Sequence, residues 1–150
     1  MIRADQLQIG DYVLVSGTPR RVESITKKKI GYHINPQTDN RLYYARLHDV
    51  EPIEITEKFL LKNGFVRGVD VSGVHKVYVY HGDKDEFGMS QNIVRVNLYK
   101  ELGVLVRTER TCRDSKIGLH VKSAHRPDSQ FVHQLQQVCR LCGIEIDWKL

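Results

Sequence analysis

Two cysteines, Cys139 and Cys142, have the Cys-x-x-Cys spacing found in zinc sites, in redox couples and on the buried side of ordinary helices. A zinc site needs four ligands, so the pair would have to be joined by side chains from Cys112, His120 and His125. No second close pair of this kind occurs in the sequence. We expect no metal and no cofactor, with zinc binding as the alternative.

Hydrophobic periodicity predicts a helix over residues 128–142, and its pattern favours packing for the two cysteines. At about 100° per residue, both thiols fall inside an apolar arc of about 120° that we expect to face the core. A redox pair belongs at a helix N-terminus, where the helix dipole stabilises a thiolate. This pair instead comes just before Gly143, a typical helix stop. Packing is therefore the preferred interpretation.

The opposite side of the same helix carries His133, Gln134, Gln136 and Gln137. The helical wheel places His133 away from the apolar arc, so we expect it outside the core. His133, Gln134 and Gln137 are candidates for binding a partner, and local or solvated contacts are the alternative interpretation.

Two basic clusters are candidates for contacting nucleic acid. Lys27, Lys28 and Lys29 fall at a predicted hairpin tip, where they either meet phosphates or simply keep a strand edge soluble. The second cluster contains Arg107, Arg110, Arg113 and Lys116.

Aromatic residues of the first fifty residues offer another surface. Tyr12, Tyr32, Tyr43 and Tyr44 either line a groove for a proline-rich peptide or complete the core of a small β-barrel.

No group of residues in the sequence matches a catalytic motif. There is no Gly-x-Ser-x-Gly, no phosphate-binding glycine loop and no His-Glu-x-x-His. The 150 residues carry a net charge of +5, which permits an anionic partner without requiring one. Three cysteines and the absence of a secretory or membrane-spanning segment suggest a cytoplasmic protein without membrane contacts. We expect that the protein is not an enzyme.

Two parts are expected along the chain. Residues 1–54 contain about five short strands separated by Gly, Pro and Asn turns, which predicts a small closed barrel. Residues 55–150 predict an α+β domain in which a short helix, N-capped by Thr56 and ended at Gly64, precedes period-two strands. A C-terminal helix is expected to cover this antiparallel sheet, followed by a short strand in "IEIDW".

Two resemblances accompany this reading. "LQIGDYVLV", "RRVESI" and "LHDVEPIEIT" resemble the SH3-like barrels at the start of many small bacterial proteins. "EPIEITEKFLLKNGF" followed by "FVHQLQQVCRLCG" is similar to a family of small uncharacterised bacterial and phage proteins. The chain departs from that pattern at Phe131, where Tyr is usual, and at Cys139 and Cys142. The family resemblance implies no biochemical role.

The sequence therefore favours an α+β binding protein without enzymatic activity. A protein–protein adaptor is the leading hypothesis, and the resemblance implies a mobile-element origin. A nucleic-acid-associated module is the alternative, and a metal-dependent enzyme is a third hypothesis.

Overall fold

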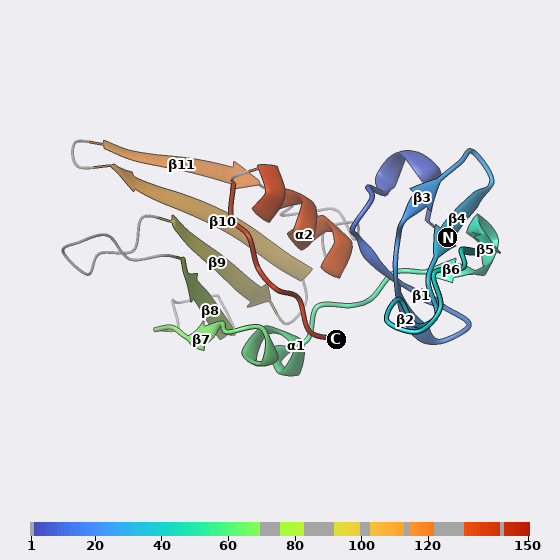
Figure 1. Ribbon diagram of the computed structural model, residues 1–150. Coiled ribbons are helices and arrows are strands. Elements are labelled where there is room, and N and C mark those ends of the chain that lie inside the picture. Colours follow the sequence, from blue (N-terminus) through green and yellow to red (C-terminus); the bar gives the residue numbers. More distant parts are fainter. Residues whose placement is uncertain are drawn as a thin grey trace. The chain divides into compact units, whose positions relative to one another are not determined.

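The computed structural model shows a chain that divides into two compact units (Figure 1). Unit 1 contains Met1–Glu54 and Phe131–Gln137, and unit 2 contains Ile55–Gln130 and Val138–Leu150. The structure describes residues 2–69, 76–82, 92–99, 103–112, 115–121, 131–141 and 143–150, and for residues 92, 99, 103–112 and 115–121 it describes the backbone alone. The predicted second part, residues 55–150, differs from unit 2 because the first turns of the terminal helix are counted with unit 1.

Unit 1 contains two three-stranded antiparallel sheets, with strand orders β2-β1-β6 and β3-β4-β5. Two short 3-10 helices, η1 and η2, connect or precede these strands. The elements are η1 Ala4–Gln6, β1 Tyr12–Val15, β2 Thr18–Arg21, β3 Ser24–Ile25, β4 Lys29–Tyr32, β5 Tyr43–Arg46, η2 Leu47–Asp49 and β6 Val50–Glu51.

These sheets are open, and the prediction of a closed barrel is corrected on this point. Strands β3 and β6 have only two residues each, and within the described residues no ladder joins one sheet to the other. Both sheets nevertheless share one apolar core, because Val13 and Val50 of the first sheet cluster with Ile30 and Ala45 of the second. Shared burial therefore holds the two sheets together where strand pairing does not.

Unit 2 contains a five-stranded antiparallel sheet with strand order β11-β10-β9-β8-β7 (Figure 1). The α+β class predicted from the sequence is therefore correct. Strand β9 buries Val94 and Val96 on alternate positions, as its period-two pattern predicts. Strand β8 differs, because Tyr78 is buried along with the valines on either side of it. The strands are β7 Val66–Arg67, β8 Lys76–His81, β9 Asn92–Tyr99, β10 Gly103–Cys112 and β11 Ser115–Val121.

The short helix α1, Glu57–Lys62, has the caps that the sequence predicts. The Thr56 hydroxyl oxygen accepts a hydrogen bond from the Phe59 backbone N–H at 3.2 Å. Gly64 ends the helix region with a φ of 81°, in the left-handed region that favours glycine. Phe59 and Leu60 are buried, so packing stabilises a helix too short to be stable alone.

The segment after the terminal helix does not form the predicted short strand, because residues 144–150 have no regular secondary structure. The buried amide of Asn63 binds this segment instead. Its Nδ2 donates to the Lys149 carbonyl at 2.8 Å, and its Oδ1 accepts from the Lys149 N–H at 2.6 Å. Trp148 stacks on Phe59 with ring centroids 5.8 Å apart. A side-chain amide thus takes the place of the strand partner that the tail lacks.

Replacing Asn63 by alanine is expected to lower the free energy of unfolding by about 1–3 kcal/mol, because both backbone groups of Lys149 lose their partner. Urea unfolding followed by fluorescence would measure this change, since Trp148 is the only tryptophan and lies in the tail. Asn40→Ala, at an exposed position, is the matched control. Equal midpoints for the two variants would show that the amide does not hold the tail.

Helix α2, Val132–Leu141, confirms the predicted terminal helix from Val132 on. Phe131 is not part of the helix, because it forms an isolated antiparallel bridge with Glu54, and residues 128–130 and 142 lie outside the described residues. Gly143 ends it with a φ of 69°, and the Ile144 N–H donates to the Cys139 carbonyl at 2.8 Å. The prediction that this helix covers the five-stranded sheet stays a prediction. In the part of the chain that the structure describes, no helix is long and apolar enough to cross a membrane.

Candidate functional site

A buried polar cluster joins the start of α2 to the N-terminal strands within unit 1. It consists of Asp11, His133, Gln136 and Gln137, three of them with at most 2% of their surface exposed. The Gln136 side-chain oxygen accepts a hydrogen bond from the Tyr12 N–H of β1 at 2.8 Å. Gln137 donates from Nε2 to the Asp11 carboxylate at 2.6 Å. Residues more than one hundred positions apart are therefore held together by side-chain amides.

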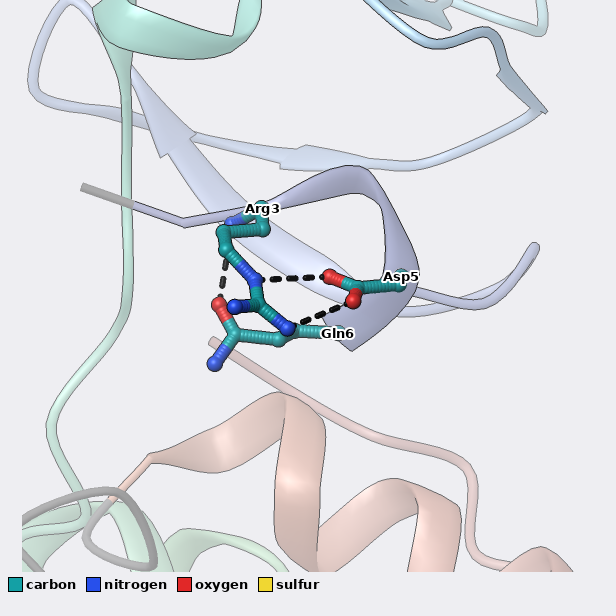
Figure 2. Close-up of polar contacts among 3 residues, drawn as sticks. All are labelled: Arg3, Asp5 and Gln6. Atoms are coloured by element: carbon teal, nitrogen blue, oxygen red, sulfur yellow. Dashed lines mark hydrogen bonds and ion pairs between the residues drawn. The ribbon is translucent and has the colours of Figure 1, made fainter.

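A second bond from Gln137 reaches the N-terminal 3-10 helix, because Nε2 also donates to the Gln6 carbonyl at 2.9 Å. Local contacts hold this helix in shape, as Figure 2 shows. The Gln6 side chain accepts from the Arg3 N–H at 2.9 Å, and Arg3 forms an ion pair with Asp5 at 2.6 Å. The ion pair raises the pKa of Arg3 and lowers the pKa of Asp5 through their mutual hydrogen bond. The carbonyl that Gln137 reaches is thus presented by a locally ordered turn.

His133 lies inside unit 1, and the prediction that it faces outward is wrong. Only 2% of its surface is exposed, and its Nδ1 has no hydrogen-bond partner among the described residues. Burial lowers the pKa of the imidazole, and the Asp11 carboxylate opposes that shift. Gln136 is buried as well. The helical wheel missed both because it counted polar side chains as solvent-facing, whereas β1 and Asp11 offer them polar surroundings.

The three side chains proposed as partner contacts are engaged within unit 1 or buried. Gln134 accepts a hydrogen bond from the Phe131 N–H at 3.4 Å, Gln137 binds Asp11 and Gln6, and His133 is buried. An Asp and a His in one cluster suggest acid–base chemistry in principle. Both side chains have at most 2% of their surface exposed, and Asp11 accepts its hydrogen bond from Gln137 of the same cluster. The cluster is best explained as a structural element whose hydrogen bonds connect the start of α2 to the N-terminal strands.

Cys139 has 1% of its surface exposed, which confirms the packing predicted for it. Cys142 and His125 lie outside the described residues, as do the side chains of Cys112 and His120. Among the side chains that the structure describes, no three of the His, Cys, Asp and Glu residues gather as metal ligands would. The zinc alternative is therefore not tested at four of its five residues.

The lysine cluster occupies the predicted hairpin tip: Lys27 and Lys28 lie between strands β3 and β4, and Lys29 is the first residue of β4. Thr26 closes the turn, donating its N–H to the Lys29 carbonyl at 2.9 Å and accepting from the Lys29 N–H through its hydroxyl at 3.1 Å. Lys27, Lys28 and Lys29 are all exposed. The turn thus presents three cations in succession at one end of the sheet.

A fourth cation faces the last of these lysines across the sheet. Strands β4 and β5 pair Lys29 directly with Arg46, and both side chains are exposed. Like charges directly opposite one another in a ladder repel. Neither residue, nor Lys27 or Lys28, forms an ion pair with a carboxylate anywhere in the described ranges. This pair therefore costs stability that a bound anion would restore.

An exposed aromatic ring lies on the same face of the sheet, two residues from Arg46. Tyr44 pairs with Gly31 across the ladder and has 60% of its surface exposed. A Cβ atom at Gly31 would stand 2.4 Å from Leu42 Cδ2 and 3.2 Å from Tyr44 Cε1. Glycine thus leaves the space into which Leu42 and Tyr44 lean. We name this surface the basic–aromatic face. It contains Lys29, Gly31, Leu42, Tyr44 and Arg46, and the exposed turn residues Lys27 and Lys28 adjoin it at the end of β4.

The other predicted groove tyrosines do not share this face. Tyr32 and Tyr43 pair across the ladder at alternate positions, and their rings lie 6.3 Å apart. Tyr32 packs against the core cluster, and the Tyr43 hydroxyl donates to Asp39 at 3.0 Å. Tyr12 is half-buried on β1. Of the four tyrosines, Tyr44 alone is exposed.

The second basic cluster lies on strands of unit 2. Arg107 and Arg110 are on β10, where the register pairs them with His120 and Ile117 of β11. Lys116 is on β11, and Arg113 lies outside the described residues. Three positions separate the two arginines along β10, so they belong to opposite faces of the ladder. The role of this cluster in contacting nucleic acid stays a prediction.

Sequence reasoning did not single out Asp11 or Arg46. Asp11 follows Gly10 and has the pattern of an ordinary turn, so nothing local marks its burial. Arg46 carried a weak signal, because Leu42, Tyr44 and Arg46 alternate along one predicted strand. Its pairing with Lys29 depends on a strand register that the sequence does not state.

The chain was compared with family models, with curated proteins and with solved structures, and none of them matches it.

Proposed function

We propose that this protein is a non-enzymatic binding module that holds nucleic acid by its phosphates against the basic–aromatic face. The observation that carries the proposal is the cross-strand pair of Lys29 and Arg46, which are exposed and have no carboxylate partner in the described ranges. Phosphates are the anions that closely spaced lysine and arginine side chains bind most generally. Lys27 and Lys28 extend the same positive surface along the hairpin.

The proposal places the alternative function ahead of the adaptor hypothesis. The adaptor hypothesis rested on His133, Gln134 and Gln137, whose contacts lie within unit 1. One observation still supports a protein partner as the second candidate. Leu42 is an exposed apolar side chain that adjoins Tyr44 around Gly31, and such side chains bind peptides as well as bases.

The fold interpretation that accompanies this proposal is an SH3-like unit 1. Six short strands in two sheets around one core support it, as does the turn at Gly10 and Asp11. We further propose a cytoplasmic protein without membrane contacts, in keeping with a basic chain that has only three cysteines.

Binding is expected to weaken steeply with salt. Four phosphate contacts on a single strand predict a slope of about −2.8 in log affinity against log salt, or about a 50-fold loss between 50 and 200 mM. Fluorescence anisotropy with a labelled mixed-sequence oligonucleotide would measure it. Exchanging Lys27, Lys28 and Lys29 for glutamate is expected to abolish binding. No binding by the unmodified protein at low salt would refute the proposal.

Arg46→Glu gives a variant whose folding is not in doubt. It replaces the repulsion from Lys29 with an attraction, so stability is expected to rise by roughly 0.2–1 kcal/mol while affinity falls. Lys58→Glu is the matched control, because it makes the same charge change at an exposed position on α1. Equal losses of affinity in both variants would mean that net charge, and not this face, determines binding.

A further inference from the structure

Tyr44 gives the basic–aromatic face a feature that phosphate binding alone does not need. Its ring is 60% exposed although it lies in the middle of a strand pair, where exposed rings lose the benefit of burial. Leu42 and Gly31 adjoin it from the same face, and the missing side chain at Gly31 lets the ring lean over β4. The ring is therefore held on the sheet and open on its outer side.

The position of Tyr44 relative to the cations matters. Tyr44 and Arg46 are two residues apart on β5, which is about 7 Å along an extended strand, and both belong to the same face. Lys29 lies directly opposite Arg46 on β4. An exposed ring with two cations beside it is the combination by which sheets hold unpaired nucleotides, with a base on the ring and the phosphate on the cations.

We infer that the ligand is single-stranded nucleic acid, with one base stacked on Tyr44 and the neighbouring phosphates on Lys29 and Arg46. This inference rests on the proposed function and adds the strandedness and the contact to a base. Duplex nucleic acid offers the same phosphates but keeps the faces of its bases stacked inside, out of reach of Tyr44. An acidic protein offers negative charge without bases, and it is treated below as an outcome of the test.

The test compares three labelled probes of about 12 nucleotides: a single-stranded DNA, the matching duplex, and a single strand of abasic sites that keeps the phosphates. Tyr44→Ala is expected to weaken binding of the base-containing single strand by about 5- to 150-fold. Its affinity for the abasic strand is expected to equal that of the unmodified protein. Tyr44→Phe keeps the ring and is expected to retain the affinity of the unmodified protein for all three probes.

The outcomes separate the two proposals. Equal losses on the abasic and base-containing strands would assign Tyr44 a structural role and overturn the inference, while salt-dependent binding would still support the proposed function. Duplex bound as tightly as the single strand, with no effect of Tyr44→Ala, would also overturn the inference and would leave the proposed function supported. Polyglutamate bound more tightly than any nucleic acid would point to an acidic protein and overturn both. No binding to any of the three nucleic-acid probes at low salt would also overturn both.

Discussion

Replacing Asp11 by alanine is expected to lower the free energy of unfolding by about 3–5 kcal/mol. The Asp11 side chain is buried, and its Oδ2 accepts hydrogen bonds from the Gln8 N–H at 2.8 Å and from Gln137 Nε2 at 2.6 Å. Hydrogen bonds to a charged acceptor contribute roughly 1.5–3 kcal/mol each, and the substitution leaves both donors without it. A loss of this size is a large fraction of the roughly 5–15 kcal/mol that stabilises an ordinary domain.

Urea unfolding followed by far-UV circular dichroism would measure this loss. Asp49→Ala is the matched control, because Asp49 is exposed beside His48, and its effect is expected to stay within about 0.5 kcal/mol. Asp11→Asn keeps an oxygen acceptor without the charge, so an intermediate loss is expected. If the Asp11→Ala and Asp49→Ala variants had the same free energy of unfolding, the hydrogen bonds of the polar cluster would not stabilise the packing of α2 on the N-terminal strands.

The second large effect is a loss of stability below about pH 6.5, caused by His133. Burial lowers the pKa of His133 in the folded chain below the ordinary value of about 6.5 that it regains on unfolding. Between these two pKa values the unfolded chain binds more protons than the folded chain. The contribution of the neutral His133 to the free energy of unfolding is therefore fully present above about pH 6.5. It is lost as the pH drops toward the folded pKa, and the free energy of unfolding then falls by up to about 1.4 kcal/mol per pH unit.

Two variants isolate this contribution from that of the carboxylates. His133→Leu removes the titrating group together with the Nδ1 atom that has no partner among the described residues, so a flatter pH profile is expected with little loss at neutral pH. His48→Gln, at an exposed position, is expected to keep the original profile. Urea midpoints at about pH 7.5 and about pH 5.5 would give the slopes. A His133→Leu profile as steep as that of the unmodified protein would assign the pH dependence to other groups.

Both predictions concern the polar cluster, whereas the proposed function belongs to the basic–aromatic face. Neither Asp11 nor His133 contributes a side chain to that face. Variants of the cluster are therefore expected to change stability, and variants of Arg46 or Tyr44 are expected to change binding. This separation allows a loss of binding to be distinguished from a loss of folding.

Local patterns predicted the elements of the chain well. The hairpin at Lys27–Lys29, the helix capped by Thr56 and the helix ended by Gly143 all follow from turn residues, capping residues and hydrophobic period. The same reasoning failed for the tail, where alternating apolar residues predicted a strand. A strand needs a neighbouring strand, and the tail found the Asn63 side chain instead.

By itself the sequence determined the α+β class, most of the strands, the cap of α1 at Thr56, the end of α2 at Gly143 and the burial of Cys139, because each depends on neighbours along the chain or on simple apolar periodicity. Only the tertiary structure decided that His133 and Gln136 are buried, that Asp11 accepts from a residue 126 positions away, and that Lys29 faces Arg46. Gln136 is buried where β1 offers its side chain a hydrogen-bond partner, and Lys29 lies opposite Arg46 only in the observed register of β4 and β5. Both conditions depend on which distant segments meet, and no local pattern states that.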